Sequence, residues 1–252
     1  SMQIIQYDHF PIQTLLPPAE AKLVRINLKK NGALVGYVQG AGDEIPAALR
    51  NMGYEVWEMK NDEVNTENLS KLDAVVLGIR ALNTNERIQF FMPDLLAYVK
   101  KGGTLIVQYN TSGRLEIDQD KFSPYPISLS RDRVTDENSV VKILKPNHPA
   151  LSVPNKISGK DFEGWVQERG LYFPDKWDAQ FEALLATNDP GEDPVEGALL
   201  VSKYGEGYYV YTGLFFFREL PEGVPGAYKL FANLVSLSKS SKPVSQKIKS
   251  GK

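Results

Sequence analysis

Residues 33–59, ALVGYVQGAGDEIPAALRNMGYEVWEM, give the clearest indication of the fold class. An apolar strand over 34–38 runs into a glycine turn, a short helix follows over 44–52, and Gly53 ends that helix. A second strand then covers 55–59. Two strands joined by a helix form a β-α-β unit, whose strands are parallel.

The chain continues this pattern downstream. Residues 72–81, LDAVVLGIRA, form a nearly continuous apolar run, as expected of a parallel strand buried on both faces. Residues 85–103, NERIQFFMPDLLAYVKKGG, place apolar residues at helical spacing, although we expect Pro93 to begin a new helix or to kink the first one. With a strand over 104–109, TLIVQY, the pattern predicts an α/β fold with a flavodoxin-like, doubly wound, mostly parallel sheet and right-handed crossovers.

Three segments are expected along the chain. They are an N-terminal arm with an edge strand at residues 1–30, an α/β domain at 31–238 and a disordered basic tail at 239–252. Within the domain, residues 111–180 interrupt the alternation as a large insertion. The remaining expected elements are an edge strand over 21–28 in the arm, a strand over 140–144, a helical turn over 161–166, a hairpin turning at 205–207 and a helix over 227–237.

Composition excludes several function classes. The 252 residues are 42% hydrophobic and contain no cysteine, so disulfides, thiolate metal ligands and cysteine nucleophiles are all excluded. Removing the five lysines from Lys239 onward from the 29 basic residues leaves 24 against 31 acidic ones, a net charge of −7 that argues against a nucleic-acid partner. The two histidines, His9 and His148, lack metal-ligand spacing. No apolar run is long enough for a membrane span, and the leading Ser1-Met2 resembles a cloning addition, so the native N-terminus and the localisation stay open.

Polar residues follow the predicted strands at the sheet edge where such folds bind ligands. The glycine turn before Asp43 resembles a phosphate loop, or is a tight turn with Asp43 as helix N-cap. Arg80 either holds an anionic or polyhydroxyl ligand or pairs with Asp43 or Glu44. Tyr109 and Asn110 suit sugar hydroxyls, or serve packing and loop anchoring.

The insertion adds a mixture of charges and aromatic rings. Such a mixture is found at polar ligand sites and equally in salt-bridged loops; here it comprises Arg131, Arg133, Asp136, Glu163, Trp165, Glu168 and Arg169. The run Phe215–Phe217 is expected to be core or an interdomain contact more than a sugar platform.

Several stretches together resemble a known family: GYVQGAGDEIPAALRNMGYEV, LDAVVLGIRALNT, YVKKGGTLIVQYNT, PYPISLSRDRVTDE, NHPAL, DFEGWVQERGLYFP and YVYTGLFFFRELPEGVPGAYKLFANL. They look like the C-terminal domain of large PIG-L-type N-acetylglucosaminyl deacetylases of Bacteroidetes-like bacteria, over residues 7–237. That domain is similar to the class I glutamine amidotransferase-like fold, especially its ThuA-like (trehalose-utilisation) branch. The resemblance implies a periplasmic or secreted parent protein.

The resemblance also implies which chemistry is missing. It puts Tyr109 at or beside the position of the amidotransferase cysteine, and no His-x-Glu pair stands near the chain's end. The deacetylase zinc motif His-Pro-Asp-Asp has no counterpart, because His148-Pro149 is followed by Ala150 and Leu151. No cofactor is therefore expected in this chain, and zinc is expected in an N-terminal deacetylase part outside it.

We therefore expect a non-catalytic accessory domain that binds a glycan or amino sugar, or docks on the deacetylase domain. The ligand face is expected to comprise Asp43, Arg80, Tyr109, Asn110, Arg131, Arg133, Trp165 and Arg169. Arg80 would hold a carboxylate or hydroxyl pair, Trp165 would stack on a sugar ring and Asn110 would bridge hydroxyls. One alternative is a ThuA-like hydrolase or isomerase acting on a sugar through Asp, Glu or Tyr, and another is a structural or dimerising domain with an apolar patch at Phe215–Phe217.

Overall fold

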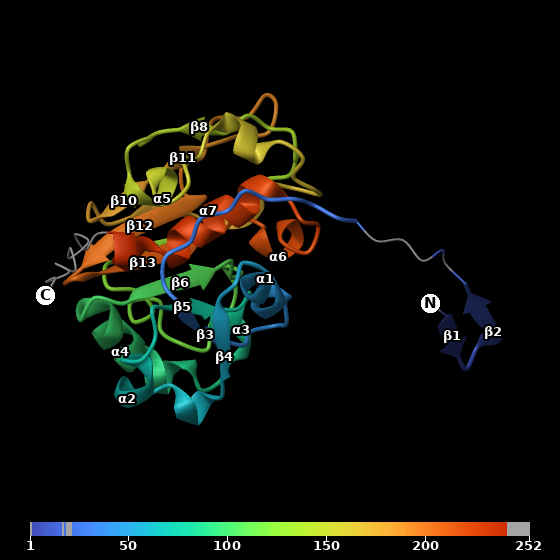
Figure 1. Ribbon diagram of the computed structural model, residues 1–252, viewed down its shortest axis with the longest axis horizontal. Coiled ribbons are helices and arrows are strands. Elements are labelled where there is room, and N and C mark those ends of the chain that lie inside the picture. The colour runs from blue at the N-terminus through green and yellow to red at the C-terminus, as the bar shows by residue number, and fades with distance from the viewer. Residues whose placement is uncertain (1, 17, 19–21, 241–252) are drawn as a thin grey trace, which may run out of the picture.

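A computed structural model of the chain describes residues 2–16, 18 and 22–240, and a seven-stranded sheet forms its centre (Figure 1). The strand order is β10-β12-β13-β6-β5-β3-β4. Five strands are parallel: β3 (Leu34–Val38), β4 (Glu55–Met59), β5 (Ala74–Leu77), β6 (Thr104–Gln108) and β13 (Gly207–Thr212). At one edge β12 (Leu199–Tyr204) and β10 (Phe181–Ala183) run antiparallel.

The order of the parallel strands confirms the predicted fold class. Numbered along the chain, these five strands lie in the spatial order 2-1-3-4-5, which is the flavodoxin-like arrangement. The two central strands, β5 and β6, are buried along their whole length, as parallel strands covered by helices on both faces must be.

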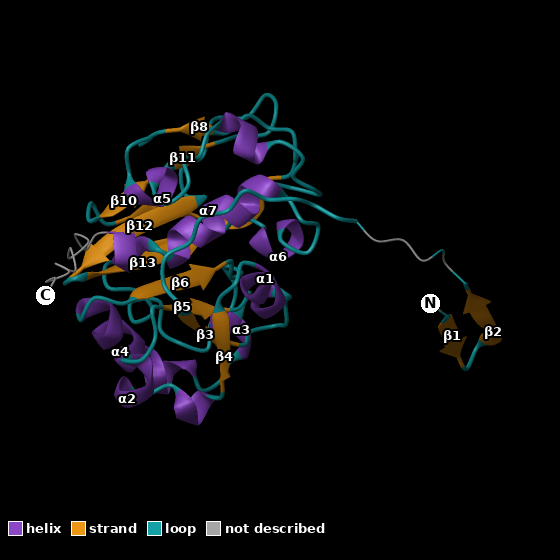
Figure 2. Cartoon of the chain, in the orientation of Figure 1, coloured by secondary structure: helices purple, strands orange, loops and turns teal. Residues whose placement is uncertain are grey.

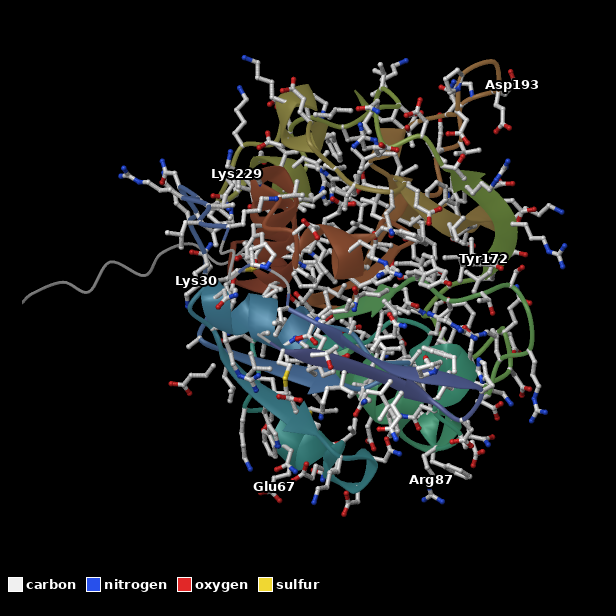
Figure 3. All side chains as sticks on the ribbon, turned by 90° about the vertical axis from the view of Figure 1, so that its right-hand side faces the viewer. Lys30, Glu67, Arg87, Tyr172, Asp193 and Lys229 are labelled. Carbon is white, nitrogen blue, oxygen red and sulfur yellow. The ribbon has the colours of Figure 1, made fainter. Side chains whose placement is uncertain are left out.

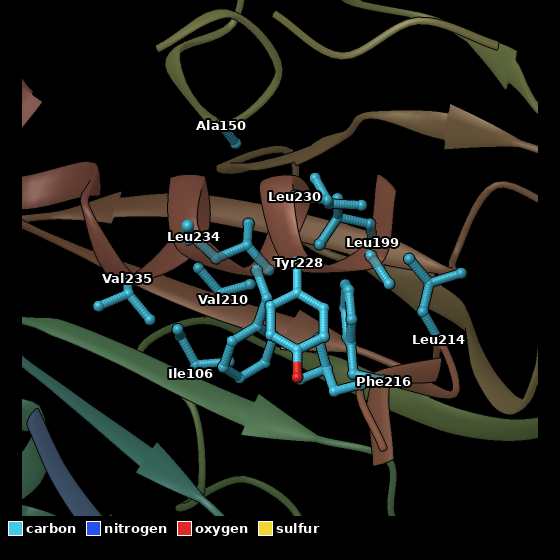
Figure 4. Close-up of a cluster of buried hydrophobic side chains, with 14 of the residues drawn as sticks. Ile106, Ala150, Leu199, Val210, Leu214, Phe216, Tyr228, Leu230, Leu234 and Val235 are labelled. Atoms are coloured by element: carbon cyan, nitrogen blue, oxygen red, sulfur yellow. The ribbon is translucent and has the colours of Figure 1, made fainter. Parts of the chain in front are cut away.

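Helices cover both faces of the sheet (Figure 2). One face carries α1 (Ile45–Asn51), α5 (Pro149–Ser152) and α7 (Pro225–Val235), and the other carries α2 (Thr66–Leu69), α3 (Ala81–Thr84) and α4 (Ile88–Lys100). A short 3-10 turn, η1 (Asn61–Glu63), follows β4. Figure 4 shows the core under α7, where Leu230 and Leu234 lie over Ile106 of β6 and Val210 of β13.

Pro93 neither begins a helix nor divides one, contrary to one of the two sequence expectations. It lies inside the continuous helix α4. Proline leaves the carbonyl group four residues earlier, that of Gln89, without an amide partner. Both residues are exposed, so water can hydrate this carbonyl and the helix continues.

The insertion packs above the antiparallel edge of the sheet in Figure 1. It contains the antiparallel pair β7 (Ile127–Val134) and β9 (Gly170–Trp177), the short strand β8 (Lys142–Ile143) and the 3-10 turn η2 (Gly159–Phe162). β8 pairs with β11 (Leu185–Ala186) just beyond the insertion. The predicted strand over 140–144 thus shrinks to two residues, and the helical turn begins two residues before its predicted start.

The N-terminal arm differs from its prediction. A hairpin of β1 (Gln3–Tyr7) and β2 (Phe10–Leu15) lies apart from the rest of the described chain in Figure 1. The edge strand predicted over 21–28 is wrong for the described residues 22–28, which form no strand. Directly after this segment, the backbone N–H and carbonyl of Lys29 both bond to the Asn155 side-chain amide, at 2.9 and 2.8 Å, and not to a neighbouring strand.

The C-terminal region is ordered further than predicted. After α6 (Phe216–Glu219) and α7, a last turn, α8 (Leu237–Ser240), brings Lys239 Nζ to 2.7 Å from the Asp73 carboxylate. The predicted disordered tail is therefore wrong at its first residues, Lys239 and Ser240, and the rest of that prediction, residues 241–252, lies outside the described part. No helix among the described residues is long and apolar enough to cross a membrane.

Candidate functional site

The loops after β3 and β5 meet at the carboxyl edge of the sheet, which is the switch point of a flavodoxin-like fold. The Ala41 N–H donates to the Ile79 carbonyl oxygen at 2.8 Å. A Cβ atom on Gly40 would lie only 2.1 Å from that same oxygen, so only glycine permits the contact. The two loops are thus joined directly, and they separate the space around them into two clefts.

Asp43 fastens this junction from within. Its carboxylate accepts hydrogen bonds from the Tyr37 hydroxyl (2.8 Å) and from the backbone N–H groups of Ile45 (3.1 Å) and Ile79 (2.9 Å). Residue Glu44, and not Asp43, is the N-cap of α1, so the predicted cap is displaced by one residue while its hydrogen bond to the helix is kept. Because the carboxylate already fills the helix start, Asp43 belongs to the scaffold, and phosphate binding by this loop is not supported.

Arg80 lies in the turn directly after β5. It has φ +56° and ψ 22°, in the left-handed region, between β5 and α3. Its backbone N–H donates to the Tyr109 carbonyl oxygen at 2.7 Å, which ties the turn to the end of β6. The side chain is exposed, and within the described chain its guanidinium forms no ion pair, so the expected partners Asp43 and Glu44 do not neutralise it.

Four aromatic rings gather beside Arg80, and we call them the Tyr109 cluster: Tyr109, Tyr172, Phe215 and Phe217. The Tyr109 ring is 5.9 Å from Phe217 and nearly parallel to it, 5.6 Å from Phe215 edge-on and 5.8 Å from Tyr172. Phe215 is buried, while the other three rings are partly exposed. Figure 3, which looks onto the right-hand side of Figure 1, labels Tyr172, which belongs to strand β9 of the insertion.

The Tyr109 hydroxyl is electrostatically coupled to its charged neighbours. Burial raises the pKa of Tyr109, and the Arg80 guanidinium opposes this rise. Glu168 and Tyr172 add to it. Tyr109 is therefore a neutral phenol near neutral pH, able to donate a hydrogen bond but unsuited to act as a nucleophile.

Glu168 and Arg218 complete the site. We call Arg80, Glu168, Arg218 and the Tyr109 cluster together the strand-end site. Burial raises the pKa of Glu168, Arg218 counteracts this, and Asp189 adds to the rise. The Arg218 guanidinium lies 5.1 Å from the Phe217 ring centre and has no ion pair in the described part of the chain. The site therefore combines rings, two cations and one carboxyl group.

A cleft of about 830 Å³ lies beside this site. Its wall includes Phe217 and Arg218 from the strand-end site, and its other lining residues are Gly42, Asp43, Glu44, Ile79, Val166, Gln167, Pro221 and Glu222. A second cleft of about 580 Å³ lies on the other side of the loop junction, between Tyr37, Lys60 and Arg87. Only the first shares residues with the strand-end site.

Three predicted ligand residues are buried, and their roles are corrected. Asn110 is 0% exposed, and its amide accepts from Leu82 N–H (2.8 Å) and donates to the Gln108 carbonyl (2.7 Å), so it cannot bridge sugar hydroxyls. Trp165 is 3% exposed, with its indole N–H bonded to Asp161, so no face is open for a sugar ring.

Arg169 is the third predicted ligand residue that is buried. It is 4% exposed, and its guanidinium donates to the carbonyl groups of Ser139 and Phe162 while lying 5.6 Å from the Trp165 ring centre. These hydrogen bonds hold the insertion together, so Arg169 has a structural part in place of the predicted ligand contact.

Arg131 and Arg133 lie on β7 in the insertion, and both are exposed. Arg133 Nη2 is 3.9 Å from a Glu192 carboxylate oxygen. No hydrogen bond or ion pair between described residues links either arginine to Arg80 or Tyr109. The structure therefore brings together Arg80 and Tyr109 from the predicted set, with Asp43 beneath them.

The sequence did not single out Tyr172, Phe217 or Arg218 as ligand residues. Each comes from a segment distant from β6, and only the fold brings them to Tyr109. The sequence did hold a signal for Phe217 and Arg218, because an aromatic residue next to an arginine after the last strand can form an aromatic–cation pair. Among the described residues, no group of three or more His, Asp or Glu side chains is arranged to hold a metal ion.

Comparisons with known proteins place the fold. No family model and no curated protein matches the chain. Among solved structures, a GMP synthase-like protein from Thermoplasma acidophilum superposes with a TM-score of 0.52 at 12% identity, over 84% of this chain and 96% of that one. A protein described as ThuA-like from Bacteroides uniformis gives 0.52 at 12% identity, over 88% and 97%. A cytoplasmic protein from Salmonella typhimurium gives 0.51 at 15% identity, over 81% and 98%.

The chain therefore has the fold shared by a ThuA-like protein and a GMP synthase-like protein. At these identities the likeness concerns the fold alone.

Proposed function

We propose that this chain is a ThuA-like binding domain without amidotransferase activity, which recognises a saccharide at the strand-end site. In its biological setting we propose that it serves a PIG-L-type carbohydrate deacetylase as an accessory domain. The observation that carries the binding proposal is the Tyr109 cluster beside the unpaired Arg80. Aromatic rings with a nearby cation and a carboxyl group suit a ring-shaped, polyhydroxylated ligand.

The chemistry of the strand end supports a binding role over amidotransfer. Amidotransfer through a covalent intermediate needs an activated nucleophile, and the chain has no cysteine. Tyr109 stands at the end of β6 with its pKa raised, and no base among the described residues forms a hydrogen bond with its hydroxyl. A phenol in this state can orient a ligand hydroxyl but does not attack a carbonyl group.

One observation favours a second candidate, a sugar-modifying hydrolase or isomerase. Burial raises the pKa of Glu168, which lies beside the Tyr109 cluster, and a partly desolvated carboxyl group can act as a general acid or base. A Glu168→Gln variant separates the two candidates. A binding domain would show no turnover in either form, even if the variant binds its ligand more weakly, whereas an enzyme would show turnover that the variant loses.

A thermal-shift screen tests the binding proposal. The panel contains neutral hexoses, amino sugars, acidic sugars and oligosaccharides, measured with the wild type, Arg80→Ala and the matched control Arg131→Ala. A ligand at 100 times its Kd should stabilise the fold by about 2.7 kcal/mol. We expect a hit that Arg80→Ala abolishes and Arg131→Ala keeps. An unchanged melting temperature across the whole panel, with well-folded protein, would contradict the proposal.

A further inference from the structure

Two guanidinium groups lie near the Tyr109 cluster, and they come from segments far apart in the sequence. Arg80 is tied by its backbone N–H to the Tyr109 carbonyl at 2.7 Å, and its charge reaches the Tyr109 hydroxyl. Arg218 lies 5.1 Å from the Phe217 ring centre, and that ring stacks on Tyr109. Two positive charges therefore lie beside one set of rings.

Apart from Arg80 and Arg218 the chain has seven arginines, and four of them have a protein partner. Arg50, Arg114 and Arg133 each have an acidic partner within 4 Å, and Arg169 is buried with its donors satisfied. Arg131, like Arg80, is exposed and forms no ion pair with a described residue, so the lack of a partner does not by itself make a site. What distinguishes Arg80 is its strained backbone and its place beside the rings.

Backbone strain independently marks the same region. The described chain has three non-glycine residues with positive φ: Arg80 (56°), Gln167 (66°) and Tyr172 (53°). Arg80 and Tyr172 contact Tyr109, and Gln167 lines the adjoining cleft with Phe217. Residues other than glycine are strained in this backbone region, and strain of this kind clusters at sites that hold ligands.

We propose that the strand-end site takes an anionic sugar. Its carboxylate or phosphate group would lie between Arg80 and Arg218, and its ring against the exposed parts of Tyr109, Tyr172 and Phe217. The Glu168 carboxyl group would bind a ring hydroxyl. Since the chain outside its basic tail carries a net negative charge, anions are repelled in general, and binding depends on these two arginines. This inference rests on the proposed saccharide binding and adds the charge of the ligand to it.

Calorimetric titration tests the charge requirement. The probes are glucuronate, galacturonate and mannuronate, each beside its neutral parent hexose and the corresponding hexose 6-phosphate, at 20 and 200 mM salt. We expect at least one anionic sugar to bind tenfold or more tightly than its neutral parent, and this preference to shrink at high salt. Arg80→Gln and Arg218→Gln should each reduce that affinity tenfold or more, and the control Arg131→Gln should leave it unchanged.

The other outcomes separate the two proposals. If neutral hexoses bind as tightly as anionic ones, and neither Arg80→Gln nor Arg218→Gln weakens them, the anionic ligand is refuted while saccharide binding stands. If no sugar binds to well-folded protein, both proposals fail. A preference for the 6-phosphate over the uronate would confirm the anion requirement and identify phosphate as its source.

Discussion

Arg169 and Arg80 are both polar residues near the carboxyl edge of the sheet, and the fold uses them in opposite ways. Arg169 is 4% exposed, and its donors bond to backbone carbonyl groups of Ser139 and Phe162. Arg80 is exposed, strained and without an ion pair among the described residues. The Arg169 side chain holds two loops together, whereas Arg80 is held by the hydrogen bonds of its backbone and its side chain forms no ion pair with a described residue.

The same division runs through the other polar residues of this edge. One group forms side-chain hydrogen bonds with backbone groups and comprises Asn110, Asp43 and Trp165. These bonds hold the loops that carry the strand-end site. Tyr109, Tyr172 and Arg218 keep polar groups or ring faces partly open. Substitutions in the first group should therefore change stability, and those in the second should change ligand binding.

The largest effect is expected from Arg169→Met. The variant removes donors from two buried carbonyl groups, so the free energy of unfolding should fall by roughly 3–5 kcal/mol. Urea denaturation measures the loss. The matched variant Arg80→Met should stay within about 0.5 kcal/mol of the wild type. Equal losses in the two variants would remove the distinction between scaffold and open residues.

The next effect concerns Glu219, a fully buried carboxylate beneath the strand-end site that accepts the Val166 N–H. Burial raises the pKa of Glu219 from 4.5 to about 7. Between these values the folded protein binds a proton that the unfolded chain releases, so the wild type should gain stability as the pH falls from 8 to 5. Glu219→Gln cannot ionise, so it should be more stable than the wild type by about 1–3 kcal/mol at pH 8 and lose this advantage by pH 5.

Urea denaturation at several pH values measures both curves, and Glu86→Gln serves as an exposed control. Parallel curves for the wild type and Glu219→Gln would show that Glu219 does not titrate in this range.

A smaller effect is expected at Arg80 itself. Glycine adopts positive φ without strain, so Arg80→Gly should be more stable than Arg80→Ala by about 0.5–1 kcal/mol, although alanine is favoured at ordinary positions. The melting temperatures of the two variants decide this. A more stable alanine variant would mean that the turn relaxes out of the left-handed region and that no strain is stored there.

The smallest effect on stability is expected from Tyr109→Phe. Its hydroxyl forms no hydrogen bond with a described residue, so the free energy of unfolding should change by less than about 0.5 kcal/mol. Tyr211→Phe is the buried counterpart, because the Tyr211 hydroxyl accepts the Asn110 N–H at 3.3 Å, and it should cost about 1 kcal/mol. A Tyr109→Phe variant as destabilised as Tyr211→Phe would place Tyr109 in the scaffold.

The parallel sheet was predictable because its strands are uninterrupted apolar runs separated by helical spacing. The strand over 55–59 agrees with β4, and the helix over 44–52 with α1 to within one residue at each end. The edge strand over 21–28 failed for a different reason. Its apolar residues Ile26 and Leu28 do pack against the core, but as an irregular segment, and apolar pattern alone cannot distinguish the two.

The site was predictable only in part. Arg80 and Tyr109 were predictable because each follows a predicted parallel strand. The carboxyl ends of such strands meet at one edge of the sheet, where this fold binds ligands. Residue type could not tell that Trp165 and Arg169 would be buried, since the same side chains serve ligand sites and packed loops equally well. Tyr172 and Phe217 reach Tyr109 only through the folding of the insertion and of the last strand's exit loop.

The most direct test of this account follows the arginine side-chain Nε–H signals by NMR while an anionic sugar that binds is added. The Arg80→Lys and Arg218→Lys variants assign the two signals of interest, and Arg169 is the internal control. Binding at the strand-end site predicts that the Arg80 and Arg218 signals shift with a common saturation curve while the Arg169 signal stays fixed. Saturable binding that leaves the Arg80 and Arg218 signals unmoved would contradict it, because the ligand would then bind elsewhere on the molecule.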